Sequence, residues 1–248
     1  MRLIARLDVK NEFVIKGIHL EGLRKVGDPN LLAKKYYDGG IDEIVIMDAV
    51  ASLYDRNNLF HVIETACREV FVPLTLGGGL RSVRDVEKAL MAGSDKVAIN
   101  TAAARRPEFI TELAKTYGSQ CVVASIEAKR NATSWEAYVD NGRNRTGLDV
   151  IEWAKRLESL GAGEILLTSV DQEGTKKGFD IELSSRVNSA VTIPVICSGG
   201  WGAADQLDKL MAKTRPSAVA AASLLHYNLA DVPQLKLWMQ HSGADVRH

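Results

Sequence analysis

The chain has no excess of charge of either sign. It contains 31 Lys and Arg residues against 31 Asp and Glu residues, so its formal net charge at pH 7 is zero. Proteins that bind nucleic acids usually carry a basic patch and a high isoelectric point. This balance gives no sign of such a patch, and we expect no nucleic-acid partner.

Long apolar runs are also missing from the sequence. No stretch approaches the roughly 18 apolar residues that indicate a membrane-spanning helix. The first residues do not follow the charged-then-apolar pattern of a secretory signal. We therefore expect a cytoplasmic protein with no membrane partner.

Cysteine and histidine are scarce. Cys67, Cys121 and Cys197 are odd in number and have no CxxC spacing, which indicates buried thiols in a reducing compartment. The five histidines show no metal-binding spacing, and no Ser/His/Asp or Cys/His arrangement stands out. The sequence thus predicts neither a metal site nor a cofactor.

What the sequence does contain is an internal duplication. The segment ARLDVK, residues 5–10, resembles ASIEAK, residues 124–129, so the carboxylate of Asp8 has a counterpart 119 residues later in Glu127. Two further pairs of segments lie at almost the same offset. They are residues 40–46 with 161–167, and residues 73–80 with 194–201. Periods this long do not belong to solenoid repeats, and they indicate two copies of a half-domain that close on each other.

Short apolar runs alternate with amphipathic stretches along the whole chain, which predicts eight strand–helix units. The predicted strands are Leu3–Leu7, Glu43–Met47, Pro73–Leu76, Lys96–Ile99, Cys121–Ile126, Glu164–Thr168, Pro194–Cys197 and Ala218–Ala221. The predicted helices are Pro29–Gly39, Leu59–Glu69, Val83–Met91, Pro107–Tyr117, Asp149–Leu160, Ile181–Asn188, Ala204–Met211 and Val232–His241. Near-continuous apolar strands call for a parallel sheet covered by helices. Eight units in two halves favour a (β/α)8 TIM barrel spanning residues 1–248 as a single domain, since a doubly wound sheet needs no halfway repeat.

Two connections after predicted strands are unusually long. Residues 8–25 contain a strand-like pattern at Glu12–His19, and residues 129–146 contain another at Trp135–Val139. Long loops in compact domains are usually functional, and both follow a strand that ends in a carboxylate.

Asp8 and Glu127 are the candidate catalytic pair. They fall at the carboxyl ends of the first and fifth strands, where barrel enzymes place their active sites. Two carboxylates facing each other suit a general acid and a general base, provided that their surroundings separate their pKa values. The alternative is that each forms an ion pair with the nearby Lys10 or Lys129. The repetition of the pair favours catalysis.

Glycine turns follow the third and seventh strands at residues 77–79 and 198–200, and a further glycine turn lies at residues 171–175 after the sixth. Such turns ahead of a helix expose backbone N–H groups that can hold a phosphate. A single turn of this kind would often be only a steric necessity. Two equivalent turns, with residues 100–101 and 222–223 after the neighbouring strands, predict a substrate with a phosphate at each end.

Charged residues also begin four of the strands, at the opposite end of the barrel: Arg2, Glu43, Lys96 and Glu164. Spacing alone favours a ring of ion pairs, each worth about 0–1 kcal/mol if exposed. The other interpretation is a plug over an axial passage.

Taken together, the segments resemble the cyclase subunit of imidazole glycerol phosphate synthase over essentially the whole chain. The matching segments are LDVK (7–10), VIKG (14–17), GDP (27–29), GIDEIVIMDAVAS (40–52), LGGG (76–79), DKVAINTAA (95–103), GSQ (118–120), GAGEILLTS (161–169), QEGTKKGFD (172–180), SGG (198–200) and AAASLLH (220–226).

The resemblance implies a lyase of histidine biosynthesis that needs no cofactor. Ammonia from a glutaminase docked on the N-terminal face would pass through the barrel to a bisphosphorylated ribulosyl-formimino-aminoimidazole carboxamide nucleotide. The products would be imidazole glycerol phosphate and aminoimidazole carboxamide ribonucleotide. Asp8 and Glu127 would be catalytic, and Arg2, Glu43, Lys96 and Glu164 would gate ammonia. The residues expected to bind substrate are Lys16, Asp48, Gly79, Asn100, Thr101, Thr168, Glu173, Gly174, Ser198, Gly200, Ala222 and Ser223.

The sequence departs from the family pattern at several places. Glu127 and Glu173 stand where aspartate is usual, Trp201 replaces a small residue, and residues 213–217 enter the eighth strand differently. Similar departures occur in paralogues that help to supply ammonia for sugar amidation in surface-polysaccharide synthesis. That activity, and a non-catalytic scaffold that activates a glutaminase, are the two alternatives to the histidine-pathway cyclase.

Overall fold

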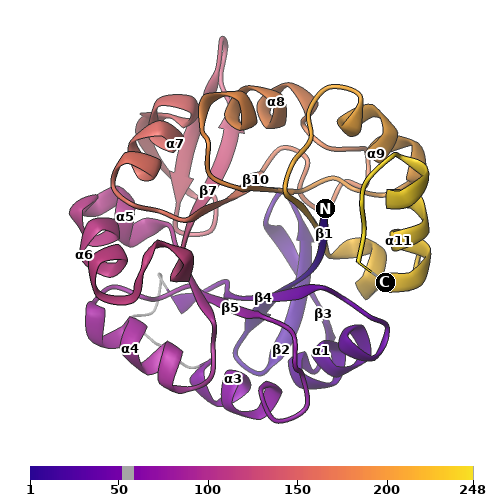
Figure 1. Ribbon diagram of the computed structural model, residues 1–248, viewed down its shortest axis with the longest axis horizontal. Coiled ribbons are helices and arrows are strands. Elements are labelled where there is room, and N and C mark those ends of the chain that lie inside the picture. The colour runs from indigo at the N-terminus through magenta and orange to yellow at the C-terminus, as the bar shows by residue number, and fades with distance from the viewer. Residues whose placement is uncertain (52–58, 248) are drawn as a thin grey trace.

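The computed structural model describes residues 1–51 and 59–247, and eight parallel strands in it close into a barrel (Figure 1). Each strand pairs with the next, and the last pairs with the first, at Arg2 with Ala218. The barrel strands are β1 (Arg2–Lys10), β4 (Glu43–Asp48), β5 (Leu74–Gly77), β6 (Lys96–Ile99), β7 (Val122–Arg130), β10 (Glu164–Ser169), β11 (Val195–Ser198) and β12 (Ala218–Ala221). The predicted (β/α)8 barrel is confirmed.

Helices surround the barrel on its outer side (Figure 1). They are α1 (Pro29–Asp38), α3 (Phe60–Ala66), α4 (Val83–Met91), α5 (Thr101–Arg105), α6 (Glu108–Tyr117), α7 (Val150–Ser159), α8 (Ile181–Ala190), α9 (Ala204–Met211), α10 (Ser223–His226) and α11 (Val232–His241), with a 3₁₀ turn at Ser119–Cys121. The short helices α5 and α10 were not predicted, because one turn is too short to show a periodic apolar pattern. They occupy equivalent places in the two halves.

Side-chain caps fix where several helices begin. Asp149 accepts hydrogen bonds from the backbone N–H groups of Ile151 and Glu152, so its prediction as an N-cap is confirmed. Pro29 lies in the first turn of α1, as expected. Pro107 instead precedes α6, which begins at Glu108. None of the helices in the described ranges has the length and apolar character needed to cross a bilayer.

The two long connections form antiparallel hairpins. The first contains β2 (Phe13–Ile18) and β3 (Glu21–Gly27), and the second contains β8 (Trp135–Val139) and β9 (Asn144–Asp149). The strand-like patterns at residues 12–19 and 135–139 were therefore interpreted correctly. The hairpin of β2 and β3 lies across one end of the barrel opening (Figure 1).

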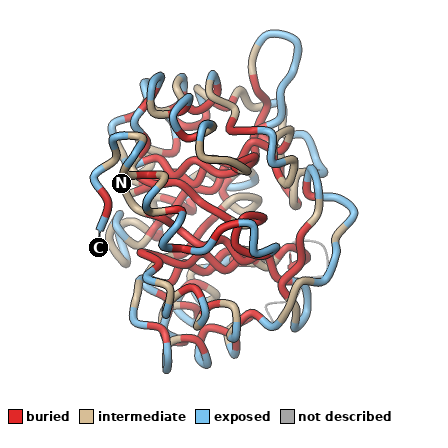
Figure 2. Tube along the Cα trace, turned by 90° about the vertical axis from the view of Figure 1, so that its right-hand side faces the viewer, coloured by how far each residue is buried: buried red, intermediate tan, exposed pale blue. Residues whose placement is uncertain are grey.

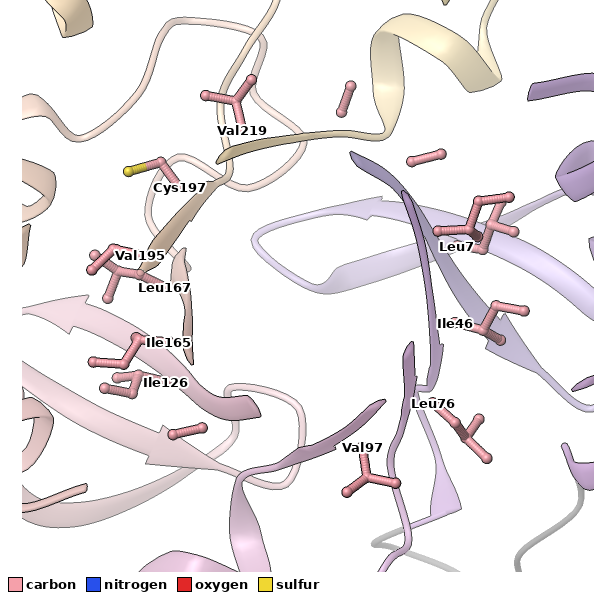
Figure 3. Packing of buried hydrophobic residues seen from close by; sticks show 14 of the residues in the cluster. Leu7, Ile46, Leu76, Val97, Ile126, Ile165, Leu167, Val195, Cys197 and Val219 are labelled. Atoms are coloured by element: carbon pink, nitrogen blue, oxygen red, sulfur yellow. The ribbon is translucent and has the colours of Figure 1, made fainter. Parts of the chain in front are cut away.

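Each barrel strand is apolar on both faces because it packs against two different neighbours. Side chains such as Leu7, Ile46, Val97 and Ile126 point away from the centre toward the helices (Figure 3). A separate cluster faces the lumen: Ile4, Val45, Met47, Ala98, Val123, Leu166, Ile196, Ala218 and Ala220. Figure 2 shows the resulting buried interior, with exposed residues confined to its periphery.

Candidate active site

The carboxyl ends of the barrel strands form a mouth at which Asp8 and Glu127 lie. Asp8 is on β1 and Glu127 is on β7, with β4, β5 and β6 between them on one side and β12, β11 and β10 on the other. The two strands are thus opposite each other, as predicted. Both carboxylates are buried, with 6% and 5% of their surface exposed. A buried carboxylate needs either a cationic partner or a bound proton. Asp8 has cationic partners, whereas Glu127 holds a proton.

Asp8 is held as an anion by two cations. Its Oδ1 accepts a hydrogen bond of 2.9 Å from Nε of Arg6, and its Oδ2 lies 3.4 Å from Nζ of Lys16. Burial alone would raise the pKa of Asp8, but the charges of Arg6 and Lys16 outweigh it and keep the pKa below its usual range. Its partners are therefore not the adjacent Lys10 that the sequence offered.

Among residues 1–51 and 59–247, no cation lies at hydrogen-bonding distance of Glu127. Its Oε2 accepts a hydrogen bond of 2.7 Å from the backbone N–H of Gly142, in the turn between β8 and β9. Burial raises the pKa of Glu127 to about 7, and the negative charges of Asp8 and Asp140 add to the effect. The pair therefore combines a carboxylate that is ionised with one that holds its proton up to about neutral pH.

The β2–β3 hairpin is joined to the loop after β10 over the mouth. Lys16 forms an ion pair with Glu173 as well as with Asp8. The backbone N–H of His19 donates to the carbonyl of Glu173 over 2.8 Å. Gly174 has a positive φ, and a Cβ there would lie 2.0 Å from the carbonyl oxygen of Gly17. Lys16, Glu173 and Gly174, all predicted site residues, are thus brought together.

Arg6 is a residue of the mouth that the sequence analysis did not single out. Its exposed fraction is 2%. Its guanidinium donates to Asp8 and, through NH1, to Thr168 Oγ1 at 2.7 Å and Ser198 Oγ at 3.3 Å. Thr168 and Ser198 were predicted to bind substrate, and in this structure their hydroxyls are partners of Arg6.

The larger hollow of the mouth, about 200 Å³ in volume, belongs to the first half-barrel. The predicted residues that line it are Asp48, Gly79, Asn100, Thr101 and Glu127. Arg6, Arg81, Arg105, Arg106 and Asn141 also line it and were not predicted. Arg81 follows the glycine turn after β5, which was the available signal, whereas Arg105 and Arg106 lie at the end of α5, a helix too short to show a periodic pattern.

Asp48 shapes this hollow by ordering the turn after β4. Its Oδ1 accepts hydrogen bonds from the backbone N–H groups of Val50 and Ala51, at 3.0 and 2.9 Å. Burial raises the pKa of Asp48. On the other side of the hollow, Thr101 Oγ1 accepts from the backbone N–H of Asp140.

A smaller hollow, about 10 Å³ in volume, belongs to the second half-barrel. The predicted residues that line it are Glu173, Gly174, Ser198, Gly200, Ala222 and Ser223. Trp201 lies at its edge, but its ring packs beside those of Phe179 and Trp238, and its Nε1 donates to the carbonyl of Ala203. The glycine turns of both halves therefore each border a hollow, the second much smaller than the first.

The four charged residues at the other end of the barrel form a closed ring. Arg2 pairs with Glu43 at 2.6 Å and with Glu164, and Lys96 pairs with the same two carboxylates at 3.2 and 3.0 Å. Burial opposes the charge of Arg2, but Glu164 and Glu43 outweigh it and raise its pKa. The glutamates are buried and the cations partly buried, so the ring lies across the floor of the barrel.

Nothing in the described part of the chain resembles a metal centre. No group of three or more His, Cys, Asp or Glu side chains within residues 1–51 and 59–247 is arranged to hold a metal ion.

Comparison with known proteins identifies the family. The family model described as "Histidine biosynthesis protein" matches residues 2–231. The chain belongs to this family. A curated relative from Legionella pneumophila, named imidazole glycerol phosphate synthase subunit HisF, is 58% identical over 209 residues, which cover 84% of this chain and 99% of the relative. The resemblance read from the sequence is thereby confirmed.

The raised pKa of Glu127 predicts a pH-dependent cost to stability. Between the ordinary value of 4.5 and about 7, the unfolded chain loses this proton while the folded protein keeps it, so stability falls as pH rises. The difference corresponds to about 3 kcal/mol. We expect Glu127→Gln to be more stable than the wild type by about that amount at pH 8 and by much less at pH 5. Urea unfolding at both pH values measures this, and an equal difference at both would contradict it.

Proposed function

We propose that this protein is the cyclase subunit of an imidazole glycerol phosphate synthase. It uses ammonia to convert a bisphosphorylated ribulosyl-formimino-aminoimidazole carboxamide nucleotide into imidazole glycerol phosphate and aminoimidazole carboxamide ribonucleotide. The reaction is a lyase step of histidine biosynthesis. The 58% identity to the Legionella pneumophila subunit over 84% of the chain carries the proposal.

The two carboxylates of the mouth supply the proton transfers. Ammonia addition and ring closure both need protons removed from nitrogen and delivered to oxygen. Asp8, ionised between Arg6 and Lys16, is the base. Glu127, protonated up to about pH 7, is the acid. Two groups whose surroundings separate their pKa values can divide acid and base roles in this way.

The two phosphates of the substrate bind at the two hollows, and the second hollow, about 10 Å³ in this structure, widens to take its phosphate. Gly79, Asn100 and Thr101 border the first, and Gly200, Ala222 and Ser223 border the second. Backbone N–H groups at glycine turns and helix starts suit phosphate oxygens. Lys16 and Asp48 at the mouth contact the substrate between its ends. A substrate anchored at both ends presents its central atoms to Asp8 and Glu127.

The ring of Arg2, Glu43, Lys96 and Glu164 marks the face that binds a glutaminase. Above it the lumen is lined by the apolar cluster around Ile4, Val45 and Leu166. Ammonia is small and neutral and can pass an apolar lumen, whereas ammonium would lose its hydration there. The ring is the one charged barrier at the start of this route among the described residues.

The decisive experiment is turnover of the bisphosphate nucleotide by the purified chain with ammonium salt and no partner. The cyclase produces both products in this assay. A protein that delivers ammonia for sugar amidation, or a scaffold that only activates a glutaminase, binds its partner and leaves the nucleotide unchanged. Inactivity with excess ammonia, despite tight binding of the nucleotide, would contradict the proposed function.

The floor ring predicts a selective defect. In Lys96→Ala, Glu43 and Glu164 keep Arg2 as their ion-pair partner but lose Lys96. The altered ring should either let ammonia from the glutaminase escape to solvent or stop it from entering the barrel. We expect a large fall in glutamine-driven turnover, while ammonium-driven turnover changes little. Lys155→Ala, which breaks an exposed pair with Glu152 on α7, is the control. Equal losses of glutamine-driven and ammonium-driven turnover would show that Lys96 has only a structural role.

A further inference from the structure

The buried guanidinium of Arg6 stands between the lumen and the reacting groups. Arg2, Ile4, Arg6 and Asp8 alternate along β1, and Ile4 belongs to the lumen cluster, so Arg6 and Asp8 share the inward face. From β1 the side chain reaches Thr168 on β10 and Ser198 on β11. It therefore spans the barrel interior past β12, directly beneath the substrate mouth.

Arg6 is also the firmest contact of Asp8. The Arg6 Nε to Asp8 Oδ1 distance is 2.9 Å, against 3.4 Å from Lys16 Nζ to Oδ2. Lys16 is shared with Glu173 and is carried by the β2–β3 hairpin. Arg6 instead belongs to the same barrel strand as Asp8, and a guanidinium keeps its charge at any ordinary pH.

The backbone of Arg6 is held in place by a contact with His226. Its carbonyl oxygen contacts Nε2 of His226 at 3.1 Å, and Nδ1 of that histidine lies 2.8 Å from the hydroxyl of Tyr36. Burial lowers the pKa of His226 to about 4. The histidine is therefore neutral at neutral pH and adds no third cation beside Asp8 there.

We propose, building on the cyclase function above, that Arg6 is a positioning residue that holds Asp8 in one orientation and in its ionised form. Asp8 then serves as the base while the proton of the pair stays on Glu127. Arg6 touches no reacting atom in this scheme and acts through Asp8. Its hydroxyl partners, Thr168 and Ser198, orient the guanidinium and so contribute to the same arrangement.

A pH profile distinguishes this role from a structural one. The charged and titratable groups that face Asp8 are Arg6 on β1, Lys16 on β2, Glu127 on β7, Glu173 after β10 and His226 on α10. In Arg6→Met, Lys16 is the one cation of the described residues that still pairs with Asp8. Because a neighbouring arginine typically lowers the pKa of an aspartate by about 1–3, we expect the acid limb of kcat against pH to move up by about that much. Free ammonia must be held constant across the pH range.

The expected loss in Arg6→Met is therefore much greater at pH 5 than at pH 7, with KM for the bisphosphate nearly unchanged. Arg6→Lys keeps the positive charge and should move the acid limb less. This variant still tests the proposal if Arg6→Met does not fold. In an Asp8→Asn background, Arg6→Met should cost little more, because a residue acting through another shows no separate effect. The same factor lost at every pH, or a raised KM with unchanged kcat, would overturn the proposal.

A second readout separates this proposal from the cyclase assignment. Carboxyl ¹³C NMR follows the titration of Asp8 in the wild type and in Arg6→Met without any substrate. An upward move of the Asp8 midpoint in the variant supports the role of Arg6 even if the wild type fails to turn over the nucleotide. An unmoved midpoint overturns that role even if the wild type is an active cyclase.

Discussion

Asp8→Asn should lower kcat for the bisphosphate nucleotide by about 10²–10⁴-fold, the usual contribution of a general acid or base. The amide can still accept the hydrogen bond from Arg6 but cannot take a proton from the substrate. Binding should be nearly unaffected, because the proposed phosphate contacts lie at the two hollows and Asp8 lines neither of them. Steady-state kinetics with saturating ammonium salt measure kcat and KM separately.

Two controls make the Asp8→Asn result interpretable. Removing one partner of a buried ion pair typically destabilises a protein by about 3–5 kcal/mol, so the kinetics must be run below the measured melting temperature of the variant. Asp38→Asn makes the same chemical change in an exposed pair with Lys34 on α1 and should leave the rate unchanged. A rise in KM with kcat preserved would show that Asp8 binds substrate and is not the base.

Glu127 offers a milder comparison on the opposite strand. Glu127→Gln should also slow the reaction, and by less than Asp8→Asn, while Gly142 still donates to the side-chain oxygen. Glu127→Asp restores the residue usual in the family and shortens the side chain by one methylene. If the mouth is adapted to glutamate, that variant should change the rate only modestly. If the wild type has no cyclase activity, Glu127→Asp alone should not create that activity.

The barrel could be predicted from the sequence because its strands are apolar on both faces. A residue such as Leu7 packs outward against helices, and Ile4 packs inward in the lumen. Both signals are local, so the strand positions and most helix boundaries were correct. The turns that were missed, α5 and α10, are too short to leave a periodic pattern.

From spacing alone, the mouth residues were predicted only where the two halves of the chain repeat, and Lys16 and Asp48 came from the family resemblance. Asp8 and Glu127, and the two glycine turns, emerged because each has a counterpart. Arg6 has none, since Ser125 occupies the equivalent position in the second half. Arg6 nevertheless lies two residues before Asp8, and residues two apart in a strand lie on the same face. This spacing was the signal that the sequence analysis missed. The contact of Lys16 with Glu173 joins residues that are 157 positions apart, and no local sequence pattern predicts it.

Gly200→Ala should severely damage the second hollow. Gly200 has φ of 93°, and its Cβ would lie 1.9 Å from the carbonyl oxygen of Gly178. The backbone N–H of Gly178 donates to the carbonyl of Gly200 over 2.8 Å, so the clash separates two loops that are bonded to each other. A displacement of about 1 Å in a positioned site can cost about 10² in rate. We expect at least that loss in kcat/KM, with weaker phosphate binding by titration calorimetry.

The control for Gly200→Ala is Gly243→Ala, at the end of α11. Gly243 also has a positive φ, 79°, but a Cβ there would meet nothing within 4 Å. It therefore carries only the left-handed backbone strain, about 1–2 kcal/mol, and should keep full activity. Gly78→Ala, whose Cβ would lie 2.3 Å from the carbonyl oxygen of Asp48, tests the first hollow in the same way. Comparable losses from Gly78→Ala and Gly200→Ala are expected of a substrate anchored at both ends. An unchanged KM in Gly200→Ala would mean that the second hollow holds no phosphate.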